Sequence, residues 1–466
     1  MSTAVATPGR IVSAFVPRKR RGAELLLLVL ALLIGVGAYA LVGLGVNDEI
    51  PTDTLEYGGA LVVLGVACHV AVRLTAPYAD PVLLPAVVAL NGLGLAMIRR
   101  IDLAELADDP DAKTFATQQL VWATLAVIGF VATLAVIRDH RRLQTYTYTF
   151  GLIGIVLLLL PLVPGLGVNI NGARIWIRAG GLSFQPGEVA KVCLAIFFAG
   201  YLVLKRDALA LAGRRFLGID LPRGRDLGPI LVMWLISLGV LVFQRDLGSS
   251  LLFFGLFVVL LYVATERPSW LVVGAALFVA GAYLGFLVFS HVQSRVDGWL
   301  NPYDDIDRYY QIVQGQYSLA WGGILGRGLG EGTPELTPYA WSDFIGTSLG
   351  EELGLTGLMA IIVIYGIIVE RGLRTALVCR DSFGKLLAVG LSVALALQIF
   401  VVLGGVTRLI PLTGLTTPFL SYGGSSLVAN WIMVALVLRV SDHARRPPPD
   451  LTPTSANDET AVVKLR

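Results

Sequence analysis

The run ELLLLVLALLIGVGAYALVGL, from Glu24 to Leu44, indicates the fold class. It holds about twenty apolar residues in succession, enough for a helix that crosses the ~30 Å of hydrocarbon in a bilayer. The basic residues before it, Arg18 to Arg21, give it the look of a secretory signal. No small-residue cleavage site follows it before the acidic loop, so we expect a transmembrane span that is retained.

The whole chain shares this apolar character. Of its 466 residues, 55% are hydrophobic and only 15% are charged, and the mean hydropathy is +0.74. A soluble protein of this composition could not cover its core with polar surface, so we predict an all-α integral membrane protein, a polytopic bundle of about 12 transmembrane helices. The predicted spans are residues 24–44, 57–75, 82–98, 118–137, 147–164, 188–204, 227–243, 248–265, 269–290, 350–369, 384–405 and 427–440.

Lysine and arginine gather at the ends of the apolar runs, and their distribution predicts the orientation. With a cytoplasmic N-terminus, 25 of the 36 basic residues lie in cytoplasmic segments and 10 in outer loops. This is the asymmetry that the positive-inside rule requires, and it makes both termini cytoplasmic. The net charge of +3 is small and no basic face is evident, so we predict no binding of nucleic acid, only contact with membrane lipid.

The same assignment divides the chain into three regions. Residues 1–23 are predicted to form a basic cytoplasmic tail, residues 24–441 the transmembrane domain, and the Pro-rich residues 442–466 a disordered cytoplasmic tail. A large extracytoplasmic loop, residues 291–349, precedes the tenth span. Within it, residues 311–325 are weakly amphipathic, which favours a place in the membrane interface. Long loops on a compact bundle commonly carry chemistry.

Charged residues in the outer segment 165–187 and the sixth span are candidates for binding an anion. Arg174 and Arg178 suit charge-assisted hydrogen bonds, although solvated loop residues would look the same. Glu188 and Lys191 lie three residues apart, on one helical face just inside the membrane. They form either an ion pair that neutralises two costly charges or part of a polar cavity that holds a headgroup.

Further polar residues lie near the ends of later spans. Asp343 either orients the loop before the tenth span or binds a headgroup. Glu351 and Glu352, at the predicted start of that span, suit helix capping as well as a functional role. In SYGGSS, residues 421–426, the small residues suit close helix packing, and headgroup contact is the second interpretation.

The residue types that usually bind metals show no local pattern. The four histidines have no ligand spacing, and the three cysteines are expected to be free thiols. The glycine-rich residues 326–332 lack the spacing and the flanking strand and helix of a nucleotide-binding loop. The sequence therefore predicts no metal site.

Six motifs occur in an order typical of one protein family. They are NGARIWI (Asn171 to Ile177), QPGEVAK (Gln185 to Lys191), DLGS (Asp246 to Ser249), DFI (Asp343 to Ile345), GEELG (Gly350 to Gly354) and PFLSYGGSS (Pro418 to Ser426). From about residue 80 to about residue 440, the chain thus resembles the SEDS proteins (shape, elongation, division and sporulation), the group of RodA and FtsW. Residues 406–418 resemble the elongation member, RodA, more than the division member, FtsW.

The resemblance implies a peptidoglycan glycosyltransferase that polymerises lipid II, an undecaprenyl diphosphate-linked disaccharide peptide. The reaction would take place on the outer face of the bacterial cytoplasmic membrane during cell elongation, with a class B penicillin-binding protein, a transpeptidase, as partner. The family's essential acidic residue follows an Asn-Pro or Asp-Pro pair in the large outer loop. Alignment on Asn301-Pro302 places Asp305 there, and because this loop is slightly shorter than in many members, Asp304 or Asp307 could take the role.

This reaction defines the roles expected of the candidates. A sugar 4-hydroxyl attacks the anomeric carbon of a glycosyl diphosphate, so a carboxylate is needed as base, and we choose Asp305. The leaving diphosphate needs cations. A divalent cation, Mg²⁺ or Mn²⁺, could share this work, but no cage of ligands is evident and no cofactor is certain. The expected substrate-binding residues are Arg174, Trp176, Arg178, Glu188, Lys191, Asp343, Arg408 and Ser421.

Three other functions fit part of the pattern. A bundle of this size with charges inside its spans could flip lipid II across the membrane rather than polymerise it. The chain could also be an FtsW-like division polymerase, or a non-catalytic scaffold that recruits cell-wall enzymes. A flippase needs charges along the crossing path, whereas a polymerase needs a base at one face. The acidic outer loop favours the polymerase.

Overall fold

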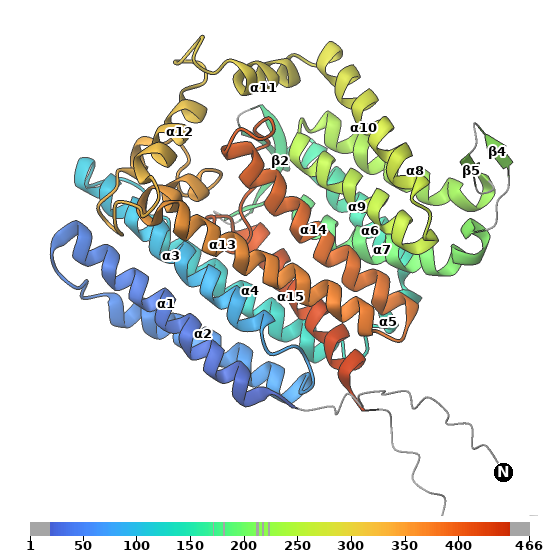
Figure 1. Cartoon of the computed structure of the whole chain (residues 1–466), viewed down its shortest axis with the longest axis horizontal. Coiled ribbons are helices and arrows are strands. Elements are labelled where there is room, and N and C mark those ends of the chain that lie inside the picture. Colours follow the sequence, from blue (N-terminus) through green and yellow to red (C-terminus); the bar gives the residue numbers. More distant parts are fainter. Residues whose placement is uncertain are drawn as a thin grey trace, which may run out of the picture.

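The computed structural model describes residues 19–170, 172–179, 182–210, 214–216, 219–221 and 224–447. They form a bundle of α-helices packed side by side (Figure 1). The predicted all-α membrane bundle is confirmed. Within the described residues, ten helices are long and apolar enough to cross a membrane: α1 (Arg21–Asn47), α2 (Thr54–Thr75), α3 (Leu83–Asp108), α4 (Ala116–Val136), α7 (Pro186–Ala210), α9 (Leu247–Thr265), α10 (Ser269–Val288), α13 (Ile345–Val378), α14 (Ser382–Val406) and α15 (Gly424–Arg445).

The other two predicted spans are shorter apolar helices. α6 (Thr147–Leu159) continues into the 3-10 helix η1 (Leu160–Leu162), and the apolar part of α8 (Gly224–Phe243) covers residues 228–243. At about 1.5 Å per residue, each is shorter than the ~30 Å hydrocarbon core of a bilayer. By length, the described part of the chain therefore has ten spanning helices rather than twelve.

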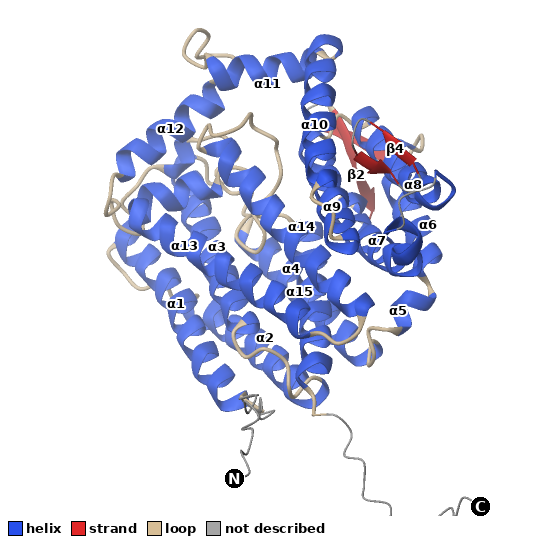
Figure 2. Cartoon of the chain, turned by 45° about the vertical axis from the view of Figure 1, so that its right-hand side comes forward, coloured by secondary structure: helices blue, strands red, loops and turns tan. Residues whose placement is uncertain are grey.

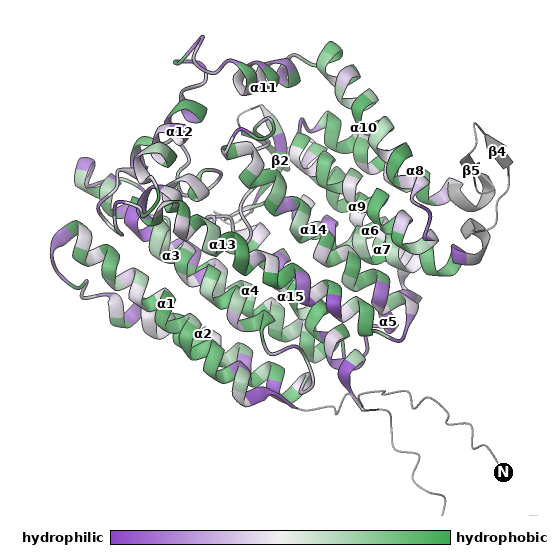
Figure 3. Cartoon of the chain, in the orientation of Figure 1, coloured by the Kyte–Doolittle hydropathy of each residue, from purple (hydrophilic) through white to green (hydrophobic). Residues whose placement is uncertain are grey.

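Burial divides the spans into an inner and an outer group. The most buried are α3, α7, α14 and α15, whereas α10 buries only Trp270 and Gly274. Figure 3 shows hydrophobic residues along the lengths of the helices and hydrophilic residues gathered mainly near their ends. The outer helices expose apolar side chains such as Leu33 and Val279, which suit contact with lipid tails.

The two ends of the bundle differ. One end, called the α11 end here, carries α11 (Ser290–Leu300) and α12 (Tyr310–Gly322), which arch over the bundle in Figure 2. The opposite end, called the α5 end, carries α5 (Arg142–Thr145), the turn between α13 and α14, and the last turn of α15. The predicted loop 291–349 is thus largely structured, and its amphipathic residues 311–325 coincide with most of α12.

Short strands, which the sequence analysis did not predict, complete the fold. The outer segment 165–187 forms an antiparallel sheet in the order β1-β2-β3, and a separate hairpin pairs β4 with β5 (Figure 2). Backbone hydrogen bonding in the sheet fixes a segment that no span buries. The strands are β1 (Gly167–Ile170), β2 (Ala173–Ala179), β3 (Leu182–Phe184), β4 (Arg214–Phe216) and β5 (Ile219–Leu221), and the 3-10 helix η2 (Pro334–Leu336) follows α12.

The start of α13 differs from the prediction. The helix begins at Ile345 rather than at residue 350, and it is interrupted at Gly354, where φ is 70°. Glycine adopts this positive φ at little cost because it has no Cβ. Glu351 and Glu352 therefore lie within α13, before its break, and the predicted capping role is wrong.

The predicted tails extend beyond the described residues. Residues 1–18 of the N-terminal tail and residues 448–466 of the C-terminal tail lie outside them. The predicted boundary at residue 442 is wrong, because α15 continues to Arg445. Asp442 is buried in this last turn and accepts a hydrogen bond from the backbone N–H of Tyr78 at 2.8 Å, which holds the helix end against the bundle.

A buried ion pair ties α3 to α13 near the α11 end. Arg100 Nε lies 2.8 Å from Glu352 Oε1, and these two side chains are 5% and 0% exposed. Glu352 also accepts a hydrogen bond from Gly330 N at 3.1 Å, and Glu351 accepts one from Thr333 N at 2.7 Å. The two glutamates thus fasten the loop between α12 and η2 to α13.

Loss of one partner from this pair is expected to destabilise the fold. Arg100→Met leaves the Glu352 carboxylate buried without its cation, and we expect a loss of about 3–5 kcal/mol in unfolding free energy. Chemical unfolding of the purified protein in detergent measures it. Arg206→Met is the matched control, since Arg206 and Glu266 form an exposed pair at 3.1 Å and its loss should cost at most about 1 kcal/mol. Equal losses in both variants would contradict the assignment.

Candidate functional site

A cavity of about 570 Å³ lies at the α11 end of the bundle. Its wall includes residues from β2, the start of α7, the turn between α8 and α9, α11, and the loops before α13 and α15. Segments from residue 115 to residue 424 therefore meet around one space. Its volume is within the usual range of small-molecule sites, about 300–1,000 Å³.

Two arginines and three carboxylates line the cavity. Arg245 follows α8 in the turn before α9, and Arg295 lies on α11. Arg295 Nη1 donates a hydrogen bond to the backbone oxygen of Leu412 at 2.7 Å, which fixes the guanidinium at the wall. Guanidinium groups suit phosphate oxygens, and carboxylates suit sugar hydroxyls. The carboxylates are Glu188, Asp246 and Asp343.

Asp246 and Asp343 are held in place by local hydrogen bonds. Asp246 caps α9, its Oδ1 accepting from the backbone N–H of Ser249 at 2.9 Å. Asp343 accepts from Ser342 Oγ at 3.0 Å. Burial raises the pKa of the Asp343 carboxyl to about 6, because removal from water disfavours the charged form, while the bond from Ser342 and the charge of Arg295 act in the opposite direction.

The raised pKa of Asp343 predicts a pH dependence of stability. A carboxyl whose pKa is higher in the folded than in the unfolded chain stabilises the fold when protonated, and this contribution is lost as the pH rises from about 4 to about 6. Asp343→Asn removes the titration, so the stability of the variant relative to the wild type should increase by about 2–3 kcal/mol as the pH rises from 4 to 7. Unfolding at both pH values measures this. The exposed Asp304→Asn serves as control, and a pH-independent difference for Asp343→Asn would contradict the assignment.

Glu188 and Lys191 form the predicted ion pair. Lys191 Nζ lies 2.8 Å from Glu188 Oε2, and both side chains are buried. The ammonium group also donates to Gln398 Oε1 at 2.7 Å and to Asn430 Oδ1 at 3.4 Å. Glu188 lines the cavity. The ion-pair interpretation is therefore confirmed, and headgroup binding at the cavity, which Glu188 lines, stays a prediction.

Aromatic side chains form another part of the wall. The rings of Phe115 and Trp341 stack with centroids 4.6 Å apart and an interplanar angle of 17°, and the ring of Tyr422 lies 5.0 Å from Phe115. Trp176 and Trp122 also line the cavity. Such rings combine flat apolar faces with polar groups at their edges. They suit a ligand that has both hydroxyls and apolar C–H faces, as a sugar does.

The fold brings only some of the predicted substrate-binding residues to this cavity. Trp176, Glu188 and Asp343 line it. Arg174 and Arg178 are exposed on β2 and are not among the residues of its wall.

Arg408 and Ser421 also lie outside the cavity wall, and both hold segments of the bundle together. Arg408 donates to the backbone oxygen of Trp299 through Nη2 at 2.9 Å and Nε at 3.1 Å, which joins the turn after α14 to the end of α11. Ser421 Oγ donates to Ser342 O at 2.6 Å and accepts from Thr417 N at 2.8 Å. The serine thereby holds the loop before α15 against the residue next to Asp343, as the packing interpretation predicts.

Asp305 lies on the turn between α11 and α12, which projects from the bundle in Figure 1. Its side chain is exposed, and Oδ1 accepts a hydrogen bond from Arg308 N at 3.1 Å. Asp304 and Asp307 in the same turn are also exposed. None of the three is in the cavity wall, although the flanking helices reach it through Arg295 and Gln311.

Several residues of the site were missed by the sequence analysis. Arg295 stood in the long loop without a motif around it, and Trp341 stood two residues before the quoted DFI. Asp246 and Tyr422 belong to quoted motifs, but no cavity role was assigned to them. Arg245, directly before DLGS, was the one residue with a usable signal, since it is a cation adjacent to a motif acid in an outer turn.

Comparison with known proteins shows which family this chain resembles. The sequence profile described as cell cycle protein, FtsW/RodA/SpoVE, matches residues 81–446. Peptidoglycan glycosyltransferase RodA of Mycobacterium tuberculosis is similar to the chain, with 51% identity over 430 residues that cover 92% of each protein. The predicted resemblance to the RodA and FtsW group is confirmed.

Two solved structures share the fold. One chain of a peptidoglycan synthase complex, described as coordinating polymerization and crosslinking, superimposes with a TM-score of 0.63 and 29% identity, covering 78% of this chain and 98% of that chain. An aspartate-to-alanine variant of the rod-shape-determining protein RodA of Thermus thermophilus gives a TM-score of 0.53 and 27% identity, covering 78% and 97%. The chain therefore belongs to the FtsW/RodA/SpoVE family of cell cycle proteins, the SEDS family.

Proposed function

We propose that this chain is a peptidoglycan glycosyltransferase that polymerises lipid II on the outer face of the bacterial cytoplasmic membrane. The observation that carries the proposal is the cavity at the α11 end, where two arginines, three carboxylates and a stacked aromatic wall meet. The 51% identity to a peptidoglycan glycosyltransferase RodA supports the reaction. It also favours a role in cell elongation over an FtsW-like role in division.

The orientation of the site follows from charge. The segments at the α5 end carry most of the lysines and arginines, which favours a cytoplasmic position for that end and for both termini. The α11 end then faces outward, where the sugar and peptide of lipid II are exposed. The cavity is on the side that the reaction requires.

The donor diphosphate is proposed to bind Arg295 and Arg245. Both guanidinium groups belong to the cavity wall, and paired N–H donors bind phosphate oxygens with more specificity than a point charge does. Phe115 and Trp341 offer a flat face to the sugar. Arg174 and Arg178 on β2 remain proposed contacts for the part of the substrate outside the cavity.

Asp305 remains the proposed base. As the acceptor 4-hydroxyl attacks the donor's anomeric carbon, a new C–O bond forms and the bond from that carbon to the diphosphate oxygen breaks. The hydroxyl proton passes to the carboxylate, and the negative charge that develops on the lipid diphosphate is met by the arginines. Because the turn that carries Asp305 joins two helices that both reach the cavity, an acceptor sugar bound beneath it would lie between base and donor.

A divalent cation has no dedicated cage at this site. Among the described residues, the groups of three potential metal ligands lie at the α5 end and not at the cavity. Mg²⁺ or Mn²⁺ could still join a carboxylate such as Asp343 to the substrate's phosphate oxygens. The arginines are therefore the protein's own contribution to charge neutralisation.

A partner is proposed from the solved complex. The similar chain belongs to an assembly that couples polymerization with crosslinking. A class B penicillin-binding protein, which is a transpeptidase, would supply the crosslinking step here. This chain would produce the glycan strand and the partner would join its peptides.

The cavity floor argues against lipid transport. A flippase needs a path for the headgroup across the bundle. Here Lys191 below the floor is bound to Glu188, Gln398 and Asn430, and all four side chains are buried. A headgroup crossing the bundle at this point would have to break this buried network. A scaffold would need neither the cavity nor the network.

A polymerisation assay tests the proposed function. The purified chain, together with its penicillin-binding partner, is given fluorescent lipid II, and the products are separated on a gel. We expect long glycan strands that a muramidase degrades. In parallel, liposomes that contain the chain and labelled lipid II report transfer between leaflets. Transfer without polymer would favour a flippase, and neither activity would favour a scaffold.

A further inference from the structure

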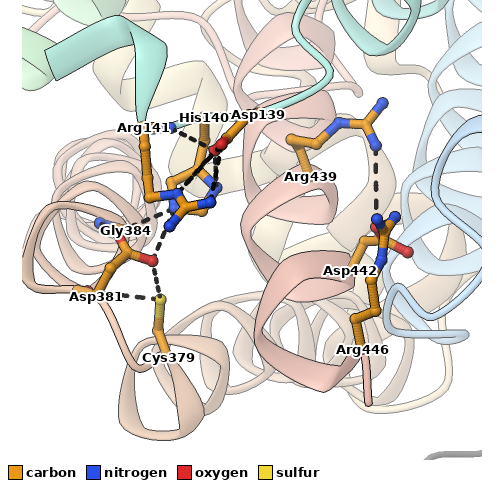
Figure 4. Close-up of polar contacts among 9 residues, drawn as sticks. All are labelled: Asp139, His140, Arg141, Cys379, Asp381, Gly384, Arg439, Asp442 and Arg446. Atoms are coloured by element: carbon orange, nitrogen blue, oxygen red, sulfur yellow. Dashed lines mark hydrogen bonds and ion pairs between the residues drawn. The ribbon is translucent and has the colours of Figure 1, made fainter. Parts of the chain in front are cut away.

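A second cluster of reactive side chains lies at the α5 end, opposite the cavity. It combines His140, from the loop between α4 and α5, with Cys379 and Asp381, from the turn between α13 and α14 (Figure 4). These segments are more than two hundred residues apart in sequence, and only the packing of the helices brings them together. The proposed function does not use them.

The three side chains supply three different kinds of potential ligand atom, which lie close together. His140 Nε2 lies 3.0 Å from Asp381 Oδ1, and Cys379 Sγ lies 3.3 Å from the same oxygen. One donor atom from each residue lies within 4.8 Å of the other two. A nitrogen, a sulfur and a carboxylate oxygen are the ligand types that zinc takes in proteins.

Gly384 leaves room where these atoms meet. A Cβ at residue 384 would lie 2.5 Å from His140 Nε2, 2.8 Å from Cys379 Sγ and 2.9 Å from Asp381 Oδ2. One potential ligand atom from each of the three residues, Oδ2 in the case of Asp381, therefore lies within 3 Å of the same point beside the glycine. Any larger residue would occupy that space and push the donors apart.

The histidine of the cluster is buried, whereas the aspartate is partly exposed to solvent. The side chains of His140 and Asp381 are 0% and 21% exposed. Within the described residues, His140 Nδ1 has no hydrogen-bond partner, and the nearest carboxylate, that of Asp139, lies 4.0 Å away. A metal-bound histidine commonly has a carboxylate behind its other ring nitrogen. Binding of an ion would draw the imidazole into this arrangement and explain a buried ring with one unsatisfied nitrogen.

We propose that His140, Cys379 and Asp381 bind a divalent transition-metal ion of the zinc class. On binding, the S–H bond of Cys379 breaks and its proton passes to water. The thiolate, Nε2 and a carboxylate oxygen then hold the ion, and a water molecule completes the tetrahedron. The ion would join the α4–α5 loop to the α13–α14 turn. No local sequence motif indicates this site, because the ligands come from separate segments.

Cobalt provides the test because its spectrum reports its ligands. The purified full-length chain, stripped of metal by a chelator, is titrated with Co²⁺. We expect one Co²⁺ per chain, with an intense sulfur-to-cobalt absorption and the visible bands of a tetrahedral site. Cys379→Ser should lose the sulfur band. Cys193→Ser, which removes a buried free thiol of α7, should keep it.

Two further variants keep the test decisive if Cys379→Ser fails to fold. Asp381 caps α14 by accepting from Gly384 N at 2.6 Å, and asparagine caps helices equally well. Asp381→Asn should therefore fold but bind Co²⁺ at least about tenfold more weakly. Gly384→Ala retains every donor yet should also weaken binding. Wild-type protein without the sulfur band, or variants that bind as tightly as the wild type, would overturn the proposal.

Discussion

Asp305→Asn is expected to lower the rate of glycan polymerisation by about 10²- to 10⁴-fold. Asparagine keeps the shape of the side chain but cannot accept a proton from the attacking hydroxyl, and removal of a general base has an effect of this size. The side chain is exposed, and among the described residues its one hydrogen bond is a local one from Arg308 N, so the fold should be unaffected. Initial rates with labelled lipid II, measured on the complex with its partner, give the effect.

The same turn supplies the controls for this prediction. Asp304→Asn and Asp307→Asn remove equally exposed carboxylates within two residues of Asp305 and should retain most of the activity. If one of them abolishes polymerisation and Asp305→Asn does not, the base is that residue. Full activity in all three variants would move the base to the cavity, where Asp343 has a pKa of about 6.

Arg295→Met is expected to reduce polymerisation by about 10²- to 10³-fold. Methionine fills a similar volume but offers no charge to the departing diphosphate. In other enzymes, removal of one donor that stabilises transition-state charge lowers kcat by a factor of this size. The fall should be mainly in kcat, since the charge develops in the transition state, with a smaller change in KM. Rates over a range of lipid II concentrations separate the two constants.

Two variants distinguish a catalytic from a structural effect of Arg295. Arg295 also donates to Leu412 O at 2.7 Å, so its loss could loosen the loop before α15. Arg408→Met removes a comparable set of bonds to the backbone oxygen of Trp299, outside the cavity wall, and should reduce stability more than kcat. Arg295→Lys, which keeps the charge, should recover part of the rate. An Arg295→Met protein with normal kcat would exclude the proposed role.

Much of the membrane fold could be predicted from local sequence. The apolar runs identified each of the ten spanning helices found in the described residues. They erred where a run was too short, as in α6, and where a helix extends beyond its apolar part, as at Ile345 and Arg445. The free energy of transferring a helix into hydrocarbon is a sum over the residues of that helix. It can therefore be estimated from the local sequence alone. The pairing of Glu188 with Lys191 was equally local, because helical geometry places residues three apart on one face.

The roles of several charged residues could not be predicted from the local sequence. Arg408 was expected to bind the diphosphate, but its guanidinium donates to Trp299 O and joins two segments of the bundle. Glu351 and Glu352 looked like helix caps, yet they hold a loop from within α13. In each case the charged group was recognised but its partner was not, since the partner lies far away along the chain.

That the chain is a membrane bundle of the SEDS family could be concluded from the sequence alone, since the hydrophobic runs and the ordered motifs are local features. Which side chains lie close together became evident from the three-dimensional packing. It placed Arg295, Arg245 and Asp343 around one cavity at one end and His140, Cys379 and Asp381 in one cluster at the other. This difference arises because the tendency of a residue to enter the membrane depends on its own chemistry, whereas the convergence of donor atoms depends on how distant helices pack and where each of them ends.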